Sequence, residues 1–450
     1  MNHELPSPPA TSNPSAAPVP PRPALEHRLA ARPALLADVH TLLDTLEQSL
    51  THDCNAHTAE DQLLVPLRQL GRTTLGQWAQ EANARCQAAV PTQYPEASQH
   101  GKTKTLRWLT TQGWVSVAET QWRLGRRGTL LRPFCIMADL QPLGTSRRMQ
   151  RVLVDFGAEG AFAPAAQRVL EHYGVDVSAG RVRQHTLAHG AQLGAQTVVP
   201  PKTAAATLVT ELDGSLIPIV TTNPERADQR KGKTLSWREA RLCLAREKDS
   251  VTPVYGATLG SAGLAGQLWR ATAVAAGLGD ATRVHGVGDG AEWIAAQFRE
   301  QFGANGKYVL DFWHVSDGLA GAAPVIAPTQ AVVWRHEQQG RLLVNDAAGV
   351  LNALLPHLEA ASQTEAPVRT AYRYLSERLD QLDYAGARAA DLPIGSGEVE
   401  GGHRHVIQER LKLTGCWWLE PHAEAMLGLR TARANGLWSA YWQSQETHHN

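Results

Sequence analysis

The most constraining feature of the sequence is a change of hydrophobic pattern at Thr207. The helix-turn-helix pattern ends before this residue, whereas TLVTELDGSLIPIVTT (207–222), LSWREARLCLA and TPVYGATLG are β-rich and predict strands. Helical and strand patterns then alternate: a helix over 264–276, a strand over 283–287, a helix over 291–302 and an apolar strand, YVLDFWHV. Antiparallel strands followed by alternating strands and helices predict an α/β protein with a mixed sheet.

Two details of this region are also predicted. The first β-rich segment contains Gly214–Ser215, where we expect it to fold back on itself. The strand YVLDFWHV is expected to end before Asp317. Beyond that residue the chain is expected to be helical as far as IGSGEVE (394–400), and helical again to its end.

The region before the sheet divides into segments of different composition. Residues 1–25 contain mainly Pro, Ser and Ala and few large apolar groups, so they cannot offset the entropy of ordering and we expect disorder. Residues 26–100 have helical periodicity. Residues 101–143 are basic, and the alternation from Trp108 to Phe134 predicts a short hairpin with basic residues at its turn.

Residues 144–200 have the pattern of a helix-turn-helix domain. A helix to about Phe156 and a second over 164–172 precede Gly174, which supplies a tight turn, and Ser178 is a suitable N-cap for a third helix. A small helical bundle without a DNA role fits the same pattern. The side chains that the third helix would present to a DNA groove are Arg181, Arg183, Gln184 and His185.

Composition narrows the function classes without identifying one. Lysine and arginine total 43 and so do aspartate and glutamate, and this formal net charge of zero argues against a uniformly basic nucleic-acid binder. The five cysteines stand singly without a C-x-x-C pair, so neither a disulfide framework nor a zinc ribbon is predicted. No apolar run reaches the roughly 18 residues of a membrane span and no secretory signal is recognisable, so we expect an intracellular protein.

Two stretches of the chain are nevertheless locally basic. The first spans 102–132 and the second spans 226–238. Either stretch could contact phosphates, although such a patch is more often a solvated face. The basic residues of the second stretch are Arg226, Arg230, Lys231, Lys233 and Arg238.

Acidic residues occupy three unusual settings. Asp213 lies in ELDG within the first strand, on the same face as Glu211. Asp289 lies in GVGDG, where a short apolar strand ends before a helix, and α/β proteins place their sites at such strand ends. Glu398 and Glu400 begin a late helix behind glycines that allow close backbone approach. Each acid alone has an ordinary explanation, as a turn residue or as a first-turn acid that complements the helix dipole.

The joint pattern of these acids is more informative than any one of them. Clustered carboxylates repel one another unless a cation neutralises them. Oxygen ligands suit Mg²⁺, and two such ions about 3.5 to 4 Å apart stabilise the attacking and leaving oxygens of an in-line phosphoryl displacement. A nuclease or a polynucleotidyl transferase would need this arrangement.

Several motifs in this order carry a resemblance to a known family. ELDG, GDGAEWI, DFWH and IGSGEVEGGHRHVIQERLKLTGCWW, followed by LRTARANGLWSAYW, resemble the DDE transposases of bacterial insertion sequences, specifically the ISKra-type group of the Mutator-like clade. The resemblance covers roughly residues 100–445. It implies an RNase H-like catalytic core over 201–320 and 393–450, an all-α insertion over 321–392, and two Mg²⁺ ions for which Mn²⁺ can substitute.

The resemblance also implies roles for individual residues. The catalytic and metal-binding triad would be Asp213, Asp289 and Glu400, because the family glutamate follows a G-S-G-x-V stretch. Glu398 and Glu400 lie about 200° apart on a helix, so only one of them can face the metals. Asp311 and His314 match a family pattern of an acid three residues before a histidine. The possible accessory residues are therefore Asp311, His314 and Arg404.

A DDE transposase implies a DNA partner and a particular reaction. The resemblance predicts binding of terminal inverted repeats and target DNA, strand cleavage followed by strand transfer, a homodimer or larger assembly, no membrane, and a cytoplasmic, nucleoid-associated location. Two alternatives remain open: a metal-dependent nuclease that only hydrolyses DNA, and a non-catalytic DNA-binding protein derived from a transposase. The residues expected to contact DNA are Arg181, Arg183, Gln184, Arg230, Lys231 and Lys233. Relatives commonly carry paired-cysteine ribbons upstream of the helix-turn-helix, whereas only Cys135 stands there in this chain.

Overall fold

The computed structural model describes most of the chain, and its contacts divide the chain into two compact units, Met1–Ser146 and Arg147–Asn450. Apart from Ala24 and Leu25, the tail predicted to be disordered over 1–25 lies outside the described residues. Among the described residues, no helix combines the length and the apolar character that crossing a bilayer requires. The described residues are 24–51, 54–101, 103–125, 128–140, 143–196, 199–223, 225, 228 and 232–447.

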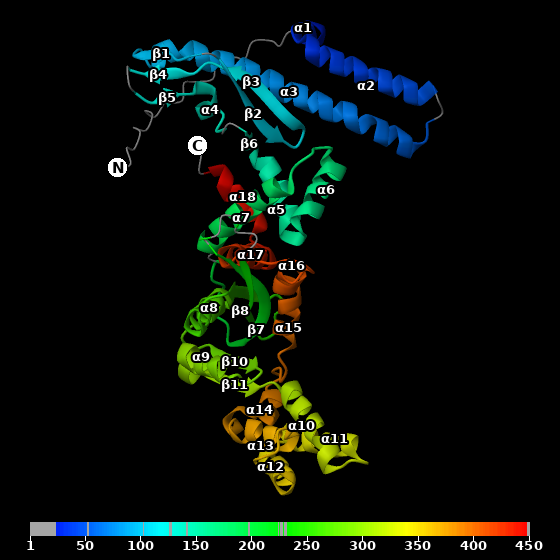
Figure 1. The fold of residues 1–450 in the computed structure, drawn as a ribbon, viewed down its shortest axis with the longest axis vertical. Helices are drawn as coiled ribbons and strands as arrows, with labels where there is room; N and C mark the ends of the chain where they lie inside the picture. Colours follow the sequence, from blue (N-terminus) through cyan, green and yellow to red (C-terminus); the bar gives the residue numbers. More distant parts are fainter. Residues whose placement is uncertain are drawn as a thin grey trace. The chain divides into compact units, whose positions relative to one another are not determined.

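Unit 1 combines long helices with two small sheets. The predicted helical region is present, and its longest helix begins where the Asn55 side chain accepts a hydrogen bond from the Thr58 N–H at 3.0 Å. Ala79 and Ala82 of that helix pack on Trp108 and Phe134 in the core of the unit. The helices are α1 (Leu25–Ala30), α2 (Pro33–Thr51), α3 (Ala56–Gln93) and α4 (Pro133–Met137) (Figure 1).

Two antiparallel strand pairs cover the segment in which one hairpin was predicted. Strands β4 and β5 pair at Trp122↔Leu131 and Arg123↔Leu130, and the basic segment predicted at the turn connects them. Strands β2 and β3 form a further hairpin from Lys104↔Glu119 to Thr110↔Gly113, where Gly113 adopts a positive φ. Arg126 and Arg127 of the basic stretch lie outside the described residues. The strands of unit 1 are β1 (Ala97–Gln99), β2 (Lys104–Thr110), β3 (Gly113–Glu119), β4 (Trp122–Leu124), β5 (Leu130–Leu131) and β6 (Gly144–Thr145).

Cys135 belongs to a polar cluster in the core of unit 1. The Glu119 side chain is fully buried and accepts hydrogen bonds from the backbone N–H and the thiol of Cys135, both at 3.1 Å, and from Arg132 Nε at 3.0 Å. Burial, reinforced by the Glu119 carboxylate, raises the pKa of the Cys135 thiol to about 12. All five cysteines are free thiols.

Unit 2 is built on a five-stranded mixed sheet with the strand order β11-β10-β7-β8-β9. Strands β7, β8 and β9 are antiparallel neighbours, whereas β10 and β11 run parallel to β7. The predicted α/β class and mixed sheet are therefore present. The strands are β7 (Thr207–Thr222), β8 (Lys233–Glu247), β9 (Val254–Thr258), β10 (Arg283–Gly288) and β11 (Gly306–Leu310).

The predicted fold-back at Gly214–Ser215 is wrong, because β7 is one continuous strand. It pairs with β8 from Leu208↔Glu247 to Thr222↔Lys233, and Gly214 lies within this ladder opposite Arg241. A Cβ on Gly214 would lie 2.2 Å from Glu239 Oε1. This glycine therefore makes room for a neighbouring side chain and does not form a turn.

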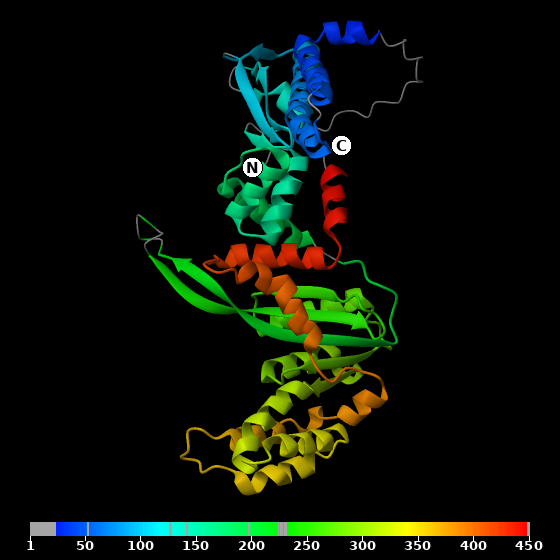
Figure 2. The same cartoon turned by 90° about the vertical axis from the view of Figure 1, so that its right-hand side faces the viewer.

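Helices cover both faces of the sheet. On one face, Trp269 of α8 (Ala262–Ala276) and Phe298 of α9 (Glu292–Phe302) pack on Leu208 and Leu212. On the other face, the C-terminal helices pack against β7 and β8, as Figures 1 and 2 show. These helices are α15 (Gly397–Gly402), the π-helix η5 (His403–Gln408), α16 (Glu409–Leu411), α17 (Glu420–Ala434) and α18 (Trp438–Thr447).

The three helices predicted over 144–200 form part of unit 2. They are α5 (Arg147–Glu159), α6 (Phe162–Tyr173) and α7 (Ala179–Gln196), with Gly174 in the left-handed region at φ 63° and Ser178 accepting a hydrogen bond from the Arg181 N–H. The C-terminal half of α7 packs closely on α17: a Cβ on Gly190 would lie 2.4 Å from the Ala425 carbonyl oxygen.

Residues 312–389 form a helical block between β11 and α15, as predicted for 321–392. The prediction that DFWHV continues the strand is wrong, because Asp311 is the N-cap of α10 and the helix starts at Phe312. Val315 and Leu319 of α10 pack on Val368 and Leu375 of α13 in a separate core. The elements of the block are α10 (Phe312–Ile326), α11 (Ala331–Leu343), α12 (Ala347–Leu354), η3 (Leu355–His357), α13 (Pro367–Ser376), η4 (Leu379–Gln381) and α14 (Tyr384–Ala389), with η2 (Gly303–Asn305) preceding β11.

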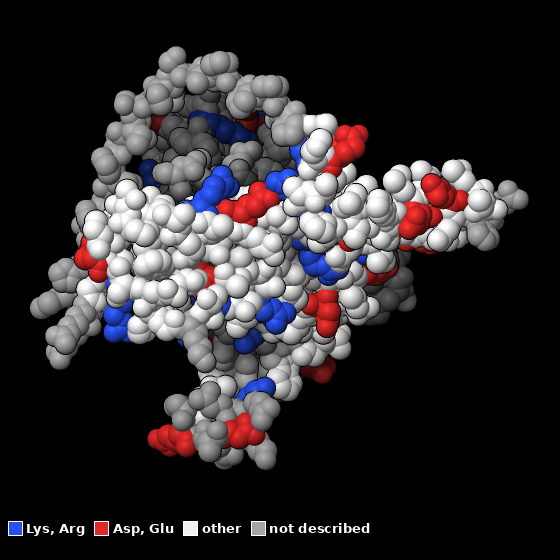
Figure 3. All heavy atoms as spheres, turned by 90° about the horizontal axis from the view of Figure 1, so that it is seen from above, with Lys and Arg blue, Asp and Glu red and all other residues white. Residues whose placement is uncertain are grey.

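The ends of β7 and β8 extend beyond the other strands as a two-stranded ribbon (Figure 2). The inner face of the ribbon carries Ile217 and Ile219, which are buried, whereas Trp237 on the outer face is 59% exposed. On the face of the molecule in Figure 3, Lys and Arg side chains are interspersed with Asp and Glu, in keeping with the zero net charge. Of the basic stretch over 226–238, Arg226, Arg230 and Lys231 lie outside the described residues.

Candidate functional site

Three acids lie at or just beyond the ends of the paired segments on neighbouring strands. The β7–β10 ladder ends at Glu211↔Val287, and Asp213 and Asp289 each follow two residues later, Asp289 beyond the end of β10. The β10–β11 ladder ends at Gly288↔Leu310, and Asp289 and Asp311 directly follow these two residues. Asp213, Asp289 and Asp311 are called the acid row.

Glu211 adds a buried carboxyl group beside this row. Its side chain lies on the face that α15 covers, and its Oε2 accepts a hydrogen bond from the Val399 N–H at 2.7 Å. Burial raises the pKa of Glu211 to about 8, and the nearby carboxylates of Glu398 and Asp311 act in the same direction. Glu211 is therefore held mostly protonated at neutral pH, which limits the repulsion among the neighbouring acids.

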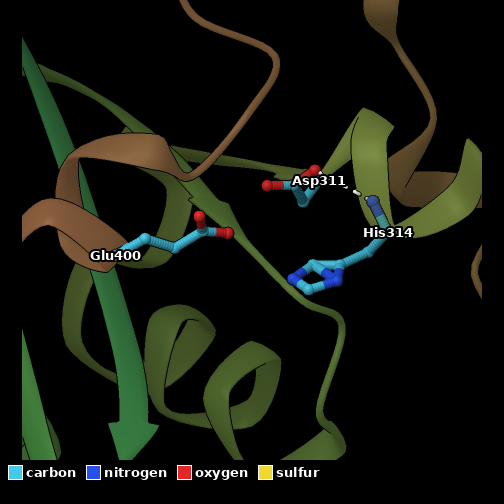
Figure 4. A group of neighbouring side chains, drawn as sticks. All are labelled: Asp311, His314 and Glu400. Carbon is cyan, nitrogen blue, oxygen red and sulfur yellow. Dashed lines mark hydrogen bonds between the residues drawn. The ribbon is translucent and has the colours of Figure 1, made fainter. Parts of the chain in front are cut away.

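Helix α15 brings a further acid to the row from a distant part of the chain. Ligand atoms of Glu400, Asp311 and His314 all lie within 4.8 Å of one another, and the Glu400 carboxylate points toward the other two side chains (Figure 4). Glu398, two residues earlier, pairs instead with Arg246 at 2.7 Å. The structure thus places Glu400, and not Glu398, in this group.

Close packing of α15 on the sheet depends on a glycine. A Cβ on Gly402 would lie 2.9 Å from both Leu242 Cδ2 and Tyr255 Cε1, which is closer than side chains normally approach. Gly401, the preceding residue, has nothing within 4 Å of such an atom. The absence of a side chain at 402 therefore sets how near Glu400 can approach the acid row.

Asp311 has no oxygen lone pair to spare for a metal ion. Its Oδ1 accepts hydrogen bonds from the backbone N–H groups of Trp313 and His314, at 2.6 and 3.1 Å. Its Oδ2 accepts both the N–H and the hydroxyl of Ser396, at 2.6 and 2.5 Å. A carboxylate offers about four acceptor positions, and all of them are used. Asp311 is therefore a positioning residue that holds the start of α10 beside the loop leading into α15.

Asp213 lies beside the π-helix that follows α15. Its Oδ1 accepts the Gly214 N–H at 2.7 Å, and its Oδ2 lies 3.4 Å from His403 Nε2. The His403 ring is buried, and neither of its nitrogens has a hydrogen-bond partner among the described residues. π-Turns are uncommon and are frequent at functional sites.

Asp289 is held in place by the helical block. Its Oδ1 accepts the Ala291 N–H at 2.9 Å, which leaves Oδ2 for another partner. Tyr374 of α13 donates its hydroxyl to the Asp289 carbonyl oxygen at 2.5 Å, and Arg378 Nε donates to the carbonyl oxygen of Gly290 at 2.9 Å. Block 312–389 therefore fixes the loop that follows β10.

The predicted DNA-contact residues have different surroundings. Arg183 and Gln184 of α7 are exposed, whereas Arg181 is partly buried. Burial lowers the pKa of His185 to about 4, so this ring is neutral at physiological pH. Lys233 is exposed, with its ammonium group 5.6 Å from the Trp417 ring centroid, while Arg230 and Lys231 lie outside the described residues.

Arg404 does not reach the acid group. Its side chain is exposed, and within the described part of the chain no ion pair joins it to Glu400. His405, the next residue, pairs with Glu409 at 3.2 Å. The helix therefore presents Arg404 to solvent.

The structure brings the predicted residues only partly together. Glu400, Asp311 and His314 form one group, whereas Asp213 and Asp289 join no group of three or more ligand atoms within 4.8 Å among the described residues. Sequence reasoning gave Glu211 no role and ranked His403 only among its weakest guesses. Alternation had placed Glu211 on the face of Asp213, which was a usable signal, whereas nothing in the local sequence indicates the π-turn at His403.

Comparisons with known proteins add no assignment. No protein-family model matches the chain, and no curated protein matches it significantly.

Proposed function

We propose that the protein is a DNA-acting polynucleotidyl transferase of the DDE type, a transposase that binds insertion-sequence ends and performs strand cleavage and strand transfer. The observation that supports this proposal most is that acids follow the paired ends of β7, β10 and β11, and that α15 brings Glu400 to Asp311 and His314 beside them. A mixed sheet covered on both faces and interrupted by a helical block before its last acid is also what an RNase H-like core would require.

The donor set suits a divalent ion that prefers oxygen ligands. The Glu400 carboxylate is exposed. Asp289 Oδ1 accepts the Ala291 N–H, and Asp213 Oδ1 accepts the Gly214 N–H, so each of these aspartates has a second oxygen that accepts neither bond. Asp213, Asp289 and Glu400 would hold Mg²⁺, with Mn²⁺ as a substitute. Such ions, two in a transposase, would neutralise charge at the phosphate and activate the attacking oxygen.

The chain's own side chains would position the DNA around this donor set. His314 is exposed beside Glu400 and can donate a hydrogen bond to a phosphate oxygen. Asp311 holds His314 through its backbone N–H. Arg183 and Gln184, near the start of α7, are placed as the reading residues of a recognition helix are. Lys233 and the neighbouring Arg230 and Lys231 would bind backbone phosphates.

A second candidate function is DNA binding without catalysis. It is favoured by one observation: Asp311 uses its acceptor positions internally, and neither Asp213 nor Asp289 joins the Glu400 group. A protein descended from a transposase could retain the fold and the end-binding helices in this way.

The test is incubation of the purified protein with labelled DNA of the flanking element ends, in Mg²⁺ and in EDTA. A transposase cuts and joins the ends in Mg²⁺ only, a simple nuclease gives cut product without joined product, and a binding protein shifts the DNA without cutting it. Glu400→Gln should abolish cutting while end binding persists.

The matched control for this experiment is Glu398→Gln, on the same helix but paired with Arg246. Cutting should survive in this variant at a rate near that of the wild type once folding has been checked by thermal unfolding. Cutting that survives in Glu400→Gln but not in Glu398→Gln would contradict the assignment of Glu400.

A further inference from the structure

The side chain of Trp313 is unusually exposed for its type. Tryptophan is on average well buried in folded proteins, yet 64% of this residue is accessible to solvent. It stands in the first turn of α10, between the buried Phe312 and the exposed His314. Single exposed apolar side chains are common on protein surfaces, so the neighbours of this ring decide what it can do.

The Trp313 ring packs against its neighbours on two sides. The backbone N–H of Trp313 donates to Asp311 Oδ1 and fixes the start of the helix, while the ring itself meets Phe312 edge-on, with centroids 5.4 Å apart and planes at 81°. On its other side the ring edge approaches Gly395, where a Cβ would lie 2.8 Å from Cδ1 and 3.0 Å from Nε1 of the indole. The ring therefore contacts Phe312 and Gly395 and leaves most of its surface exposed to solvent.

The exposed ring lies next to the candidate catalytic group. His314 is the following residue, and its ring lies with the carboxylates of Asp311 and Glu400 within 4.8 Å. The Asp311 carboxylate accepts hydrogen bonds from the backbone N–H groups of both Trp313 and His314. The same carboxylate therefore fixes the backbone that carries the exposed ring and the backbone that carries His314. A ligand that places a phosphate at Glu400 and His314 would bring its neighbouring planar group to Trp313.

We propose that Trp313 is a stacking platform for one unpaired base of a DNA strand whose phosphate lies at Glu400 and His314. The inference rests on the proposed DNA-directed function. Bases stack on aromatic side chains irrespective of their identity, because every base has a π-face. A base within a duplex is covered by its neighbours, so the strand must be single or the base must leave the stack.

Other tryptophans are less suited to this role. Trp418 is buried in the core of unit 2, and Trp334 is partly buried against the core of the helical block. Trp417 is also exposed, but its ring lies 5.6 Å from the Lys233 ammonium group, whereas Trp313 directly precedes His314 of the Glu400 group. Trp237 is nearly as exposed as Trp313 but lies on the outer face of the β7–β8 ribbon, which makes it the matched control.

The experiment measures the binding of the full-length protein to two labelled DNA strands of about eight nucleotides, within the site size of a single-strand groove. One strand carries thymine at every position, and the other has the same sugar-phosphate backbone without bases. All measurements are made in Ca²⁺, which takes oxygen ligands and can neutralise the charge between Glu400 and the phosphate, and recovery of intact strands checks that cleavage does not enter. The wild type should bind the thymine strand roughly 5- to 100-fold more tightly than the abasic strand.

The variants separate the role of Trp313 from a loss of folding. Trp313→Ala should reduce the preference for bases by about fivefold or more, Trp313→Phe should retain part of it, and Trp237→Ala should retain all of it. Thermal unfolding checks that each variant is folded. With 5-iodouracil in the thymine strand, irradiation should attach the DNA to the peptide that contains Trp313.

The outcomes distinguish this inference from the function on which it rests. An unchanged base preference in Trp313→Ala, or attachment to the peptide that contains Trp237, overturns the stacking role. A wild type that binds both strands equally also overturns it, while DNA binding stands. A wild type that binds neither strand, nor element-end DNA, overturns both.

Discussion

Asp311 and Ser396 are joined by two hydrogen bonds, since the backbone N–H and the hydroxyl of Ser396 both donate to Asp311 Oδ2. Asp311 caps α10, and Ser396 directly precedes α15. The contact therefore fastens the beginning of the helical block to the loop that leaves it. The positions of His314 and Glu400 relative to each other depend on this pair.

Replacement of Asp311 should destabilise unit 2. In the wild type, both carboxylate oxygens of Asp311 accept hydrogen bonds. In Asp311→Asn, one of these oxygens becomes an amide N–H₂ that faces other donors, so the free energy of unfolding should fall by about 2–4 kcal/mol. Denaturant unfolding measures the change. Asp317→Asn is the control, because Asp317 is an exposed residue of the same helix. Equal free energies of unfolding for the two variants would contradict the positioning role of Asp311.

The two neighbouring glycines of α15 should respond in opposite directions to alanine. Gly402→Ala should lower stability by about 1–3 kcal/mol, because the added methyl group would meet Leu242 and Tyr255. Gly401→Ala should raise stability by up to about 1 kcal/mol, because its site is open and alanine favours a helix. Thermal unfolding of the pair tests both signs, and a stabilised Gly402→Ala would disprove the close approach of α15 to the sheet.

The buried His189 should make unit 2 less stable in mild acid. Its Nδ1 lies 2.6 Å from the Tyr441 hydroxyl, and its Nε2 lies 2.8 Å from Gln150 Oε1. A neutral imidazole has one donor and one acceptor nitrogen, so it can form both hydrogen bonds. Burial lowers the pKa of His189 to about 4. Below about pH 6.5 the unfolded chain protonates His189, whereas the folded chain does so only near pH 4. The contribution of neutral His189 to the free energy of unfolding is therefore full above about pH 6.5 and is lost as the pH falls toward 4.

The size of the acid effect can be isolated with one variant. Between pH 7 and pH 5, His189 should account for about 2 kcal/mol of lost stability, at about 1.4 kcal/mol for each pH unit below 6.5. His189→Gln lacks the titrating ring. Between pH 7 and pH 5, its free energy of unfolding should therefore fall by about 2 kcal/mol less than that of the wild type. Denaturant midpoints at the two pH values provide the measurement, and parallel losses in both proteins would show that His189 is not responsible.

Thiol chemistry should distinguish Cys135 from Cys54. Burial and the Glu119 contact raise the pKa of Cys135 to about 12, and the thiolate is the reactive form. Brief alkylation at pH 8 should therefore modify the partly exposed Cys54 and spare Cys135, as read by mass spectrometry. In denaturant both cysteines should react. Rapid native labelling of Cys135 would mean that the Glu119 cluster does not form.

Much of the fold was predictable because hydrophobic period reports secondary structure directly. The strands and helices between Thr207 and Leu310 follow the alternation read from the sequence. The two errors have a common cause. Gly214 and the DFWH segment resemble a turn and a strand locally, but a distant partner decides each of them: Glu239 fills the space at Gly214, and Ser396 completes the cap that Asp311 forms.

The candidate site was predictable where a motif indicated it and not where packing creates it. Glu400 was selected by the G-S-G-x-V stretch, and the Arg246 pairing of Glu398 agrees with that choice. The contact of His403 with Asp213 depends on a π-turn, and the exposure of Trp313 depends on how Gly395 approaches it. Neither local propensity nor spacing contains that information.

The π-helix η5 changes the direction in which side chains point along the continuous segment formed by α15, η5 and α16. A π-turn holds about one residue more than an α-turn, so residues after Gln408 are rotated by about 100° from the phase that α15 begins. Glu400 can then face the acid row while Arg410 enters between the rings of Phe162 and Trp418, 4.7 and 4.8 Å from their centroids. A chain one residue shorter between Glu400 and Arg410 could satisfy only one of these two environments.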